Sequence, residues 1–211
     1  MSQTSQPRPD ARSRAGVPFV GLTGGLGAGK STALAALQRL GAATLSTDAV
    51  VHDLYGTEEL REAVVGRWGE DVVADGVVDR AAVATRAFAA PEERAWLEAQ
   101  IWPLVSARVA AWRAELAALD PRPCAAVVET PLLFEAGLQD SYDATIVVVA
   151  DEQLRLRRAR ARGHVGVDAR AARQLPQEEK ARRATYAVVN DGTVAQLEVK
   201  LSDVLARLCG G

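Results

Sequence analysis

Short apolar runs alternate with helical segments along most of this chain. The runs that predict strands are residues 19–23, 44–46, 124–128, 144–149 and 187–189. Two of these runs, 124–128 and 144–149, are uninterrupted and rich in valine. Such runs are typical of strands that are buried on both faces of a parallel sheet. Strands that alternate with helices therefore predict an α/β fold built on a parallel sheet.

Helical spacing of apolar residues fills the intervals between these runs. We predict helices at residues 30–40, 151–162 and 168–183, the last apart from Pro176. Thr193 and Gln196 have the spacing of a capping box, and the helix that begins after them has one apolar face. Residues 49 to about 119 are mostly helical, with breaks at Gly56, residues 66–69 and Gly76. We therefore predict a helical insertion between the second and third strands.

Length and composition describe an ordinary globular protein. The 211 residues allow one domain, which we place at residues 17–211. Residues 1–16 are rich in Ser, Arg, Pro and Gln and lack the apolar region of a secretory signal, so we predict a disordered tail. A Ser- and Arg-rich transit peptide is the alternative. The two cysteines support neither a metal site nor a framework of disulfides, which favours a reducing compartment.

Two classes of partner are disfavoured by the same composition. The longest uncharged apolar stretch, residues 144–150, is far shorter than the ~20 residues that a membrane helix needs. The formal net charge is −2, so no overall basic field argues for nucleic acid. We expect neither a membrane nor a nucleic acid as a partner.

A glycine-rich segment after the first predicted strand carries the clearest chemical signal. It matches the pattern G-x-x-x-x-G-K-[ST] and reads Gly24-Gly25-Leu26-Gly27-Ala28-Gly29-Lys30-Ser31. Glycines let successive backbone N–H groups point at phosphate oxygens, and the N-terminus of the next helix adds partial positive charge. Lys30 would reach the β- and γ-phosphates of ATP, and the Ser31 hydroxyl would bind Mg²⁺. A chance match is improbable, because only three of the 25 basic residues are lysines.

The residues that precede the lysines narrow the class of phosphate-loop protein. A GTPase needs an Asn-Lys-x-Asp motif to bind the guanine base, and none of the three lysines comes directly after an asparagine. The sequence thus leaves kinases of small molecules and other ATPases.

Further motifs, in order along the chain, resemble those of the dephospho-CoA kinase family from about Val20 to Leu208. The glycine-rich segment is close to the opening signature of that family. Residues 76–80 resemble its Gly-x-x-Asp-Arg segment, and residues 129–135 are similar to its Pro-Leu-Leu-Phe-Glu motif. The C-terminal pattern of the family is matched by Arg158, Arg162, Arg170, Gln174, Lys180, Asn190, Asp191 and Gly192.

This resemblance implies both a fold and an activity. The fold is that of a P-loop kinase: a five-stranded parallel sheet flanked by helices, a helical substrate-binding insertion at about residues 49–119 and a lid at about residues 155–180. The activity is transfer of the γ-phosphoryl group of ATP to the 3′-hydroxyl of dephospho-CoA, the last step of coenzyme A biosynthesis. We expect a cytoplasmic protein that is a monomer or a weak homo-oligomer.

Asp48 is the candidate catalytic carboxylate, with Lys30 and Arg162 assisting. It comes directly after the second predicted strand and matches the second Asp of the Asp-x-Asp pair of the family. It would orient or deprotonate the acceptor hydroxyl, although an exposed Asp that caps a helix is the structural alternative. Arg155, Arg158 and Arg162 are spaced to share one helical face and would close over ATP. The abundance of arginine makes a solvated helical face the alternative for them.

The remaining site assignments rest on the motif and the resemblance. The nucleotide-binding set is Gly25, Gly27, Ala28, Gly29, Lys30, Ser31, Thr32, Arg158, Arg162 and Asn190. The substrate-binding set is Asp48, His52, Arg80 and Leu132, and the metal set is Ser31 and Glu129. Three of these have a structural alternative: His52 as a packed histidine, Arg80 as a partner of Asp79 or a helix cap, and Glu129 as a solvent-facing charge.

Some positions depart from the family pattern. Ser46 stands where the family has the first Asp, Trp102 replaces its usual His, Arg155 replaces Gln and Thr185 replaces an Asp. Two alternatives therefore stay open: a kinase of another small acceptor such as a nucleoside monophosphate, and an ATP-binding regulator without catalysis. We predict that the four tryptophans, Trp102 included, pack the helical insertion.

Overall fold

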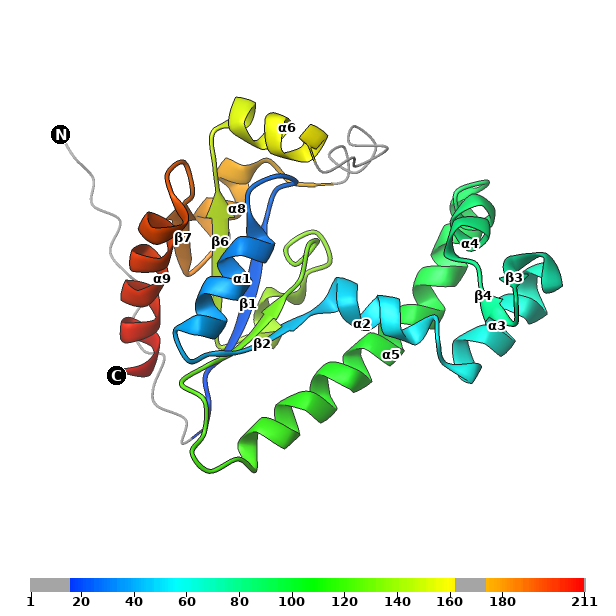
Figure 1. Ribbon diagram of the computed structural model, residues 1–211, viewed down its shortest axis with the longest axis horizontal. Coiled ribbons are helices and arrows are strands. Elements are labelled where there is room, and N and C mark those ends of the chain that lie inside the picture. The colour runs from blue at the N-terminus through cyan, green and yellow to red at the C-terminus, as the bar shows by residue number, and fades with distance from the viewer. Residues whose placement is uncertain (1–15, 162–173, 211) are drawn as a thin grey trace.

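The central sheet consists of five parallel strands (Figure 1). The computed structural model describes residues 16–161 and 174–210. The strand order is β2 (Ala43–Ser46), β5 (Ala126–Glu129), β1 (Phe19–Gly24), β6 (Ala144–Val149) and β7 (Tyr186–Val189). The prediction of a five-stranded parallel sheet is confirmed.

The register of the sheet brings distant parts of the chain to one edge. Leu22 of β1 and Ser46 of β2 both lie opposite Glu129, the last residue of β5. Because all strands are parallel, the loop after β1 and the first helix after β2 begin at this same edge. Ligands of open α/β sheets bind in the crevice outside the carboxyl ends of the strands, so this edge is where the site is expected.

Each face of the sheet is covered by helices. On one face Val20, Leu22 and Val127 pack under α1 (Lys30–Arg39) and α9 (Val194–Cys209), which contact each other. Residues of opposite parity in β1 and β5, among them Phe19 and Val128, face the other side and pack on the end of α5 (Pro91–Ala117). The predicted capping box at Thr193 and Gln196 opens α9 as expected.

A helical insertion extends from the sheet on the side away from α9 (Figure 1). It contains α2 (Thr47–Leu54), α3 (Glu58–Trp68), the 3₁₀ turn η1 (Glu70–Val72), a hairpin of β3 (Val73–Ala74) and β4 (Val77–Val78), α4 (Arg80–Ala87) and α5. These elements share an apolar core of their own, centred on Leu60, Val64, Val72 and Val83, each at most 1% exposed. The insertion therefore has an apolar core of its own, while the end of α5 also packs on the sheet.

Two of the helix breaks predicted in the insertion differ in position or form from the prediction. The break predicted at residues 66–69 falls at Gly69, which has φ 78° and ends α3, whereas Gly66 lies inside that helix, because the buried Leu60 and Val64 hold it on the insertion core. Gly76 has φ 79° and closes the β3–β4 hairpin, so the break there is a strand turn.

Two of the four tryptophans pack in the core of the insertion, as predicted. Trp68 and Trp96 meet edge to face at 5.0 Å in the insertion core, and Trp112 packs beneath the sheet. The prediction is wrong for Trp102, whose surface is 56% exposed. It occupies a position of α5 that neither core covers.

The C-terminal third contains the 3₁₀ turn η2 (Leu138–Ser141), α6 (Glu152–Ala161) and α8 (Gln177–Arg183). The predicted helix at 168–183 is wrong at residues 174 and 175, and the exception made for Pro176 is confirmed, since Pro176 has φ −51° and ψ 144° and stands before α8 as its N-cap. Arg162, Arg170 and residues 168–173 lie outside the described residues, as do residues 1–15 of the predicted tail. No helix in the described ranges is both long and apolar enough to span a membrane.

Candidate active site

The phosphate loop forms a tight turn between β1 and α1. Gly27 and Gly29 have φ values of 75° and 97°, which non-glycine residues rarely adopt. A Cβ on Gly27 would lie 2.2 Å from the carbonyl oxygen of Arg155, and one on Gly29 would lie 2.2 Å from Nδ2 of Asn190. The glycines are therefore required both by conformation and by the close approach of neighbouring segments.

Lys30, Ser31 and Thr32 form the first turn of α1, directly after this loop. The ammonium of Lys30 donates to the carbonyl oxygens of Gly24 at 3.2 Å and Gly25 at 3.5 Å, so its side chain folds back over the loop. Its charge and the helix N-terminus act on the same small volume. This arrangement suits a polyphosphate anion.

Asn190 and two arginines surround the loop. The buried side chain of Asn190 donates from Nδ2 to the carbonyl oxygen of Ala28 at 2.8 Å, and Arg158 donates to the carbonyl oxygen of Asn190 at 3.0 Å. Arg155 donates from Nε to the carbonyl oxygen of Leu26 at 3.1 Å. Arg155 and Arg158 thus face the loop rather than forming a solvated face, while Arg162 lies outside the described residues.

Glu129 lies at the carboxyl end of β5 and is only 7% exposed, so the alternative of a solvent-facing charge is wrong. The Ser46 hydroxyl donates to its Oε2 at 3.1 Å, and Thr47 Oγ1 donates to its carbonyl oxygen at 2.9 Å. Burial raises the pKa of Glu129, and the nearby ammonium of Lys30 opposes that shift. Asp48, in the first turn of α2, adds a smaller like-charge effect that also raises this pKa. The predicted metal-binding and catalytic carboxylates therefore lie near Lys30 and near each other.

Ser46, which stands where the family has an Asp, has a structural role at this site. A hydroxyl there donates a hydrogen bond to Glu129, whereas a carboxylate would repel it. Sequence reasoning missed this contact, because the two residues are 83 positions apart and only the β2–β5 register pairs them.

The residues available for Mg²⁺ fit a phosphate-bound ion. Within the described ranges, no group of three or more His, Cys, Asp or Glu side chains could hold a metal by itself. Mg²⁺ in phosphoryl-transfer sites usually takes one or two protein oxygens together with phosphate oxygens and waters. The Ser31 hydroxyl and the Glu129 carboxylate are oxygen donors of this kind, and a nearby cation would offset the cost of burying Glu129.

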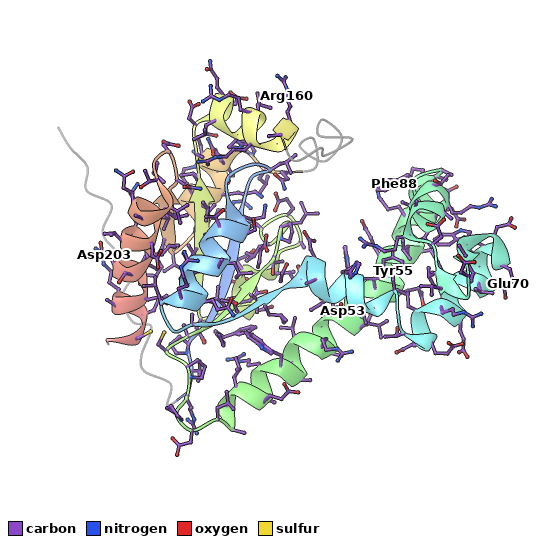
Figure 2. All side chains as sticks on the ribbon, viewed as in Figure 1. Asp53, Tyr55, Glu70, Phe88, Arg160 and Asp203 are labelled. Atoms are coloured by element: carbon purple, nitrogen blue, oxygen red, sulfur yellow. The ribbon has the colours of Figure 1, made fainter. Side chains whose placement is uncertain are left out.

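His52 and Arg80 meet on the insertion side of the site. Nη1 of Arg80 donates to Nδ1 of His52, and the guanidinium lies 5.7 Å from the ring centroid of Tyr55. Asp79 instead caps α4 by accepting from the Ala81 N–H at 2.8 Å, so the alternative of an Arg80–Asp79 pair is wrong. Figure 2 shows Tyr55 on the side of the insertion that is nearer to the sheet. An exposed arginine on this side suits an anionic substrate.

Leu132 lies in the turn after β5. It is half-buried, and its carbonyl oxygen accepts the Ala136 N–H at 2.9 Å. A substrate contact of its side chain remains a prediction.

One pair near the loop was missed by sequence reasoning. Lys180 is completely buried and lies 2.8 Å from Oε1 of Glu135. Both residues belong to motifs of the family pattern, but nothing in the sequence pairs them. The rarity of lysine in this arginine-rich chain was the available signal that Lys180 has a specific place.

A parallel five-stranded sheet with a phosphate loop after β1, carboxylates at the ends of β2 and β5 and a helical insertion defines a P-loop kinase. The model of the dephospho-CoA kinase family matches residues 18–196. A dephospho-CoA kinase of Deinococcus radiodurans is 42% identical over 196 residues, covering 90% of this chain and 91% of that protein. The chain belongs to the dephospho-CoA kinase family. The members of this family are ATP-dependent kinases.

Solved structures share the fold of this chain. The structure titled TT1252 from Thermus thermophilus has a TM-score of 0.77 and 35% identity, over 92% of this chain and 98% of that one. A dephospho-CoA kinase from Campylobacter jejuni has a TM-score of 0.68 over 92% of this chain and 98% of that one; at 23% identity it supports the fold. Family membership favours the dephospho-CoA kinase interpretation over a kinase of another acceptor or a silent regulator.

Proposed function

We propose that this protein transfers the γ-phosphoryl group of ATP to the 3′-hydroxyl of dephospho-CoA. The observation that supports it best is the position of Asp48. Asp48 lies in the first helix of the insertion and is close enough to the buried Glu129 beside Lys30 to affect its pKa. An acceptor held by the insertion would thus meet a carboxylate next to the phosphate-binding charges.

The phosphate loop binds ATP in this proposal. Its backbone N–H groups, the α1 N-terminus and Lys30 bind the ATP phosphates and neutralise the charge that spreads over the transferring group. Ser31 and Glu129 would hold Mg²⁺, which when bound supplies further charge neutralisation. Arg158 and Asn190 shape the nucleotide site, and Arg162 is assigned to the transferring phosphoryl group from the resemblance alone.

Residues of α2 and α4 bind and orient the acceptor. Asp48 orients the 3′-hydroxyl and accepts its proton as the bond to phosphorus forms. The guanidinium of Arg80 would bind the diphosphate of dephospho-CoA together with His52. Leu132 would contact the acceptor from the turn after β5.

The same proposal includes the roles of the insertion and the lid, the cellular location and the oligomeric state. The insertion at about 49–119 binds the acceptor, and the segment at about 155–180 acts as a lid. The protein works in the cytoplasm as a monomer or weak homo-oligomer and has no nucleic acid partner.

A panel of acceptors tests the substrate. Release of ADP would be measured with ATP and Mg²⁺ in the presence of dephospho-CoA, AMP, CMP or shikimate, with a Lys30→Ala variant as the inactive control. We expect ADP release to depend on dephospho-CoA. A preference for a nucleotide that lacks the pantetheine arm would refute the assignment, and tight ATP binding without transfer to any acceptor would indicate a regulator.

A further inference from the structure

One residue at the tip of the phosphate loop is held by side chains at both of its backbone groups. The N–H of Leu26 donates to Oε1 of Gln174 at 3.1 Å, and its carbonyl oxygen accepts from Nε of Arg155 at 3.1 Å. Both backbone groups of Leu26 are therefore engaged by the protein itself. Its place is set by two protein segments, α6 and the residues just before α8.

The segment that carries Gln174 is itself anchored. Oε1 of Glu135 accepts the N–H of Leu175, the next residue, at 2.8 Å. The same oxygen lies 2.8 Å from the ammonium of Lys180 in α8, and that ammonium also donates to the carbonyl oxygen of Pro131 at 3.4 Å. The turn after β5 is thus connected to the loop tip through residues 174–175.

The ion pair between Lys180 and Glu135 makes loss of the contact at Leu175 cost free energy. Lys180 has no exposed surface, so it cannot touch ATP or the acceptor, and its charge is compensated by Glu135. Oε2 of Glu135 is buried and makes no hydrogen bond, so the carboxylate depends on the contacts of its other oxygen. Removing one partner of a buried ion pair leaves an uncompensated charge, which strongly favours keeping both groups in place.

We propose that Glu135, Lys180 and Gln174 are positioning residues for nucleotide binding. The buried ion pair fixes the backbone at Leu175, Gln174 transmits that position to Leu26, and the loop is held in the shape that receives phosphates. The inference rests on the proposed binding of ATP by this loop. It assigns to these side chains no contact with substrate.

Gln174→Met tests the contact to the loop, because methionine has similar volume and cannot accept the Leu26 N–H. The dissociation constant for ATP would be measured by calorimetry, and the KM values for ATP and dephospho-CoA by steady-state assay. We expect a rise of about 2- to 13-fold in both ATP constants, the effect of one ordinary hydrogen bond, with KM for dephospho-CoA unchanged.

Gln139→Met is the matched control. Gln139 lies in η2, just before β6 and at the opposite edge of the sheet from the loop, and its Nε2 donates to Asp140 at 3.2 Å, so it also loses one side-chain hydrogen bond. We expect its ATP constants to equal those of the unaltered protein. Equal ATP binding by the Gln174 and Gln139 variants would overturn the inference and leave the proposed function intact. Failure of the unaltered protein to bind ATP would instead refute the proposed function.

The transmission itself is tested by a double-mutant cycle. Glu135→Gln retains an oxygen for the Leu175 N–H but removes the counter-charge of Lys180, and we expect weaker ATP binding. Combined with Gln174→Met, it should weaken binding no further, since both changes act through the same contact. Additive effects would overturn the transmission. Should Glu135→Gln fail to fold, the comparison of the Gln174 and Gln139 variants decides the proposal.

Discussion

Replacing Asp48 with asparagine should abolish most catalysis while leaving the fold intact. The Asp48 carboxylate is exposed and accepts no hydrogen bond from another residue within the ranges that the structure describes. Its stabilising interaction is with the N-terminus of α2, worth about 0.3–1 kcal/mol, and loss of its repulsion of Glu129 offsets part of this. The free energy of unfolding should therefore fall by less than about 1 kcal/mol.

The catalytic effect should be much larger. A positioned acid–base group contributes about 10²–10⁴-fold to rate, which corresponds to about 2.7–5.4 kcal/mol of activation free energy. We expect kcat of Asp48→Asn to fall by this factor, with nearly unchanged ATP binding. The difference between the two magnitudes separates a catalytic role from a structural one.

Asp53→Asn provides the control, since Asp53 is an exposed carboxylate near the other end of the same helix (Figure 2). The assays are ADP release in the presence of dephospho-CoA, calorimetric ATP binding and thermal unfolding of the three proteins. If Asp48→Asn kept kcat within about threefold of the Asp53 variant, or lost ATP binding to the same degree as activity, the role assigned to Asp48 would be refuted.

Three further predictions concern other groups. Burial raises the pKa of Glu129 above its ordinary 4.5, so near and above pH 4.5 the folded state binds more protons than the unfolded state. The free energy of unfolding therefore falls as the pH rises from the unfolded pKa through the folded pKa of Glu129. Urea unfolding of Glu129→Gln should show an advantage over the unaltered protein that grows from pH 4 to pH 7, while its activity needs more Mg²⁺; a constant difference in stability would contradict this. Burial, the neighbouring Cys124 and the hydrogen bond to its carbonyl oxygen raise the pKa of Cys209 from 9.0 to about 11. Iodoacetamide at pH 8 should alkylate Cys209 about 100-fold more slowly than a thiol of pKa 9, and mass spectrometry of the peptides would reveal faster labelling if this is wrong. Arg80→Ala should raise KM for dephospho-CoA about 10- to 100-fold with KM for ATP unchanged, whereas Arg86→Ala, which breaks only an exposed pair with Asp71, should change neither; equal effects would contradict a substrate contact.

The parts of the fold that depend on local chemistry were predictable from the sequence. The phosphate loop results from glycines that permit positive φ, and the start of α9 results from the capping box at Thr193. The hairpin at Gly76 was missed because its strands have two residues each, too few to show any periodicity. Trp102 was misjudged because its aromatic character suggested packing, and only the three-dimensional arrangement shows that this part of α5 is uncovered.

The parts of the site that depend on long-range pairing were not predictable from residues alone. β5 lies between β1 and β2, and this order sets Glu129 beside Ser46. The same holds for Lys180 and Glu135, which are joined through the packing of α8 against the turn after β5. Motifs identified the chemistry of these residues, whereas the topology of the sheet determined which of them act together.

The most direct test of the account is the identity of the product. The protein would be incubated with ATP, Mg²⁺ and dephospho-CoA, and the products monitored by ³¹P nuclear magnetic resonance. We predict a new phosphomonoester on the 3′-oxygen of the ribose, formed in equal amount to ADP and absent when Mg²⁺ is removed. ADP formed without any phosphorylated acceptor, or a phosphate attached at another position, would contradict the central claim.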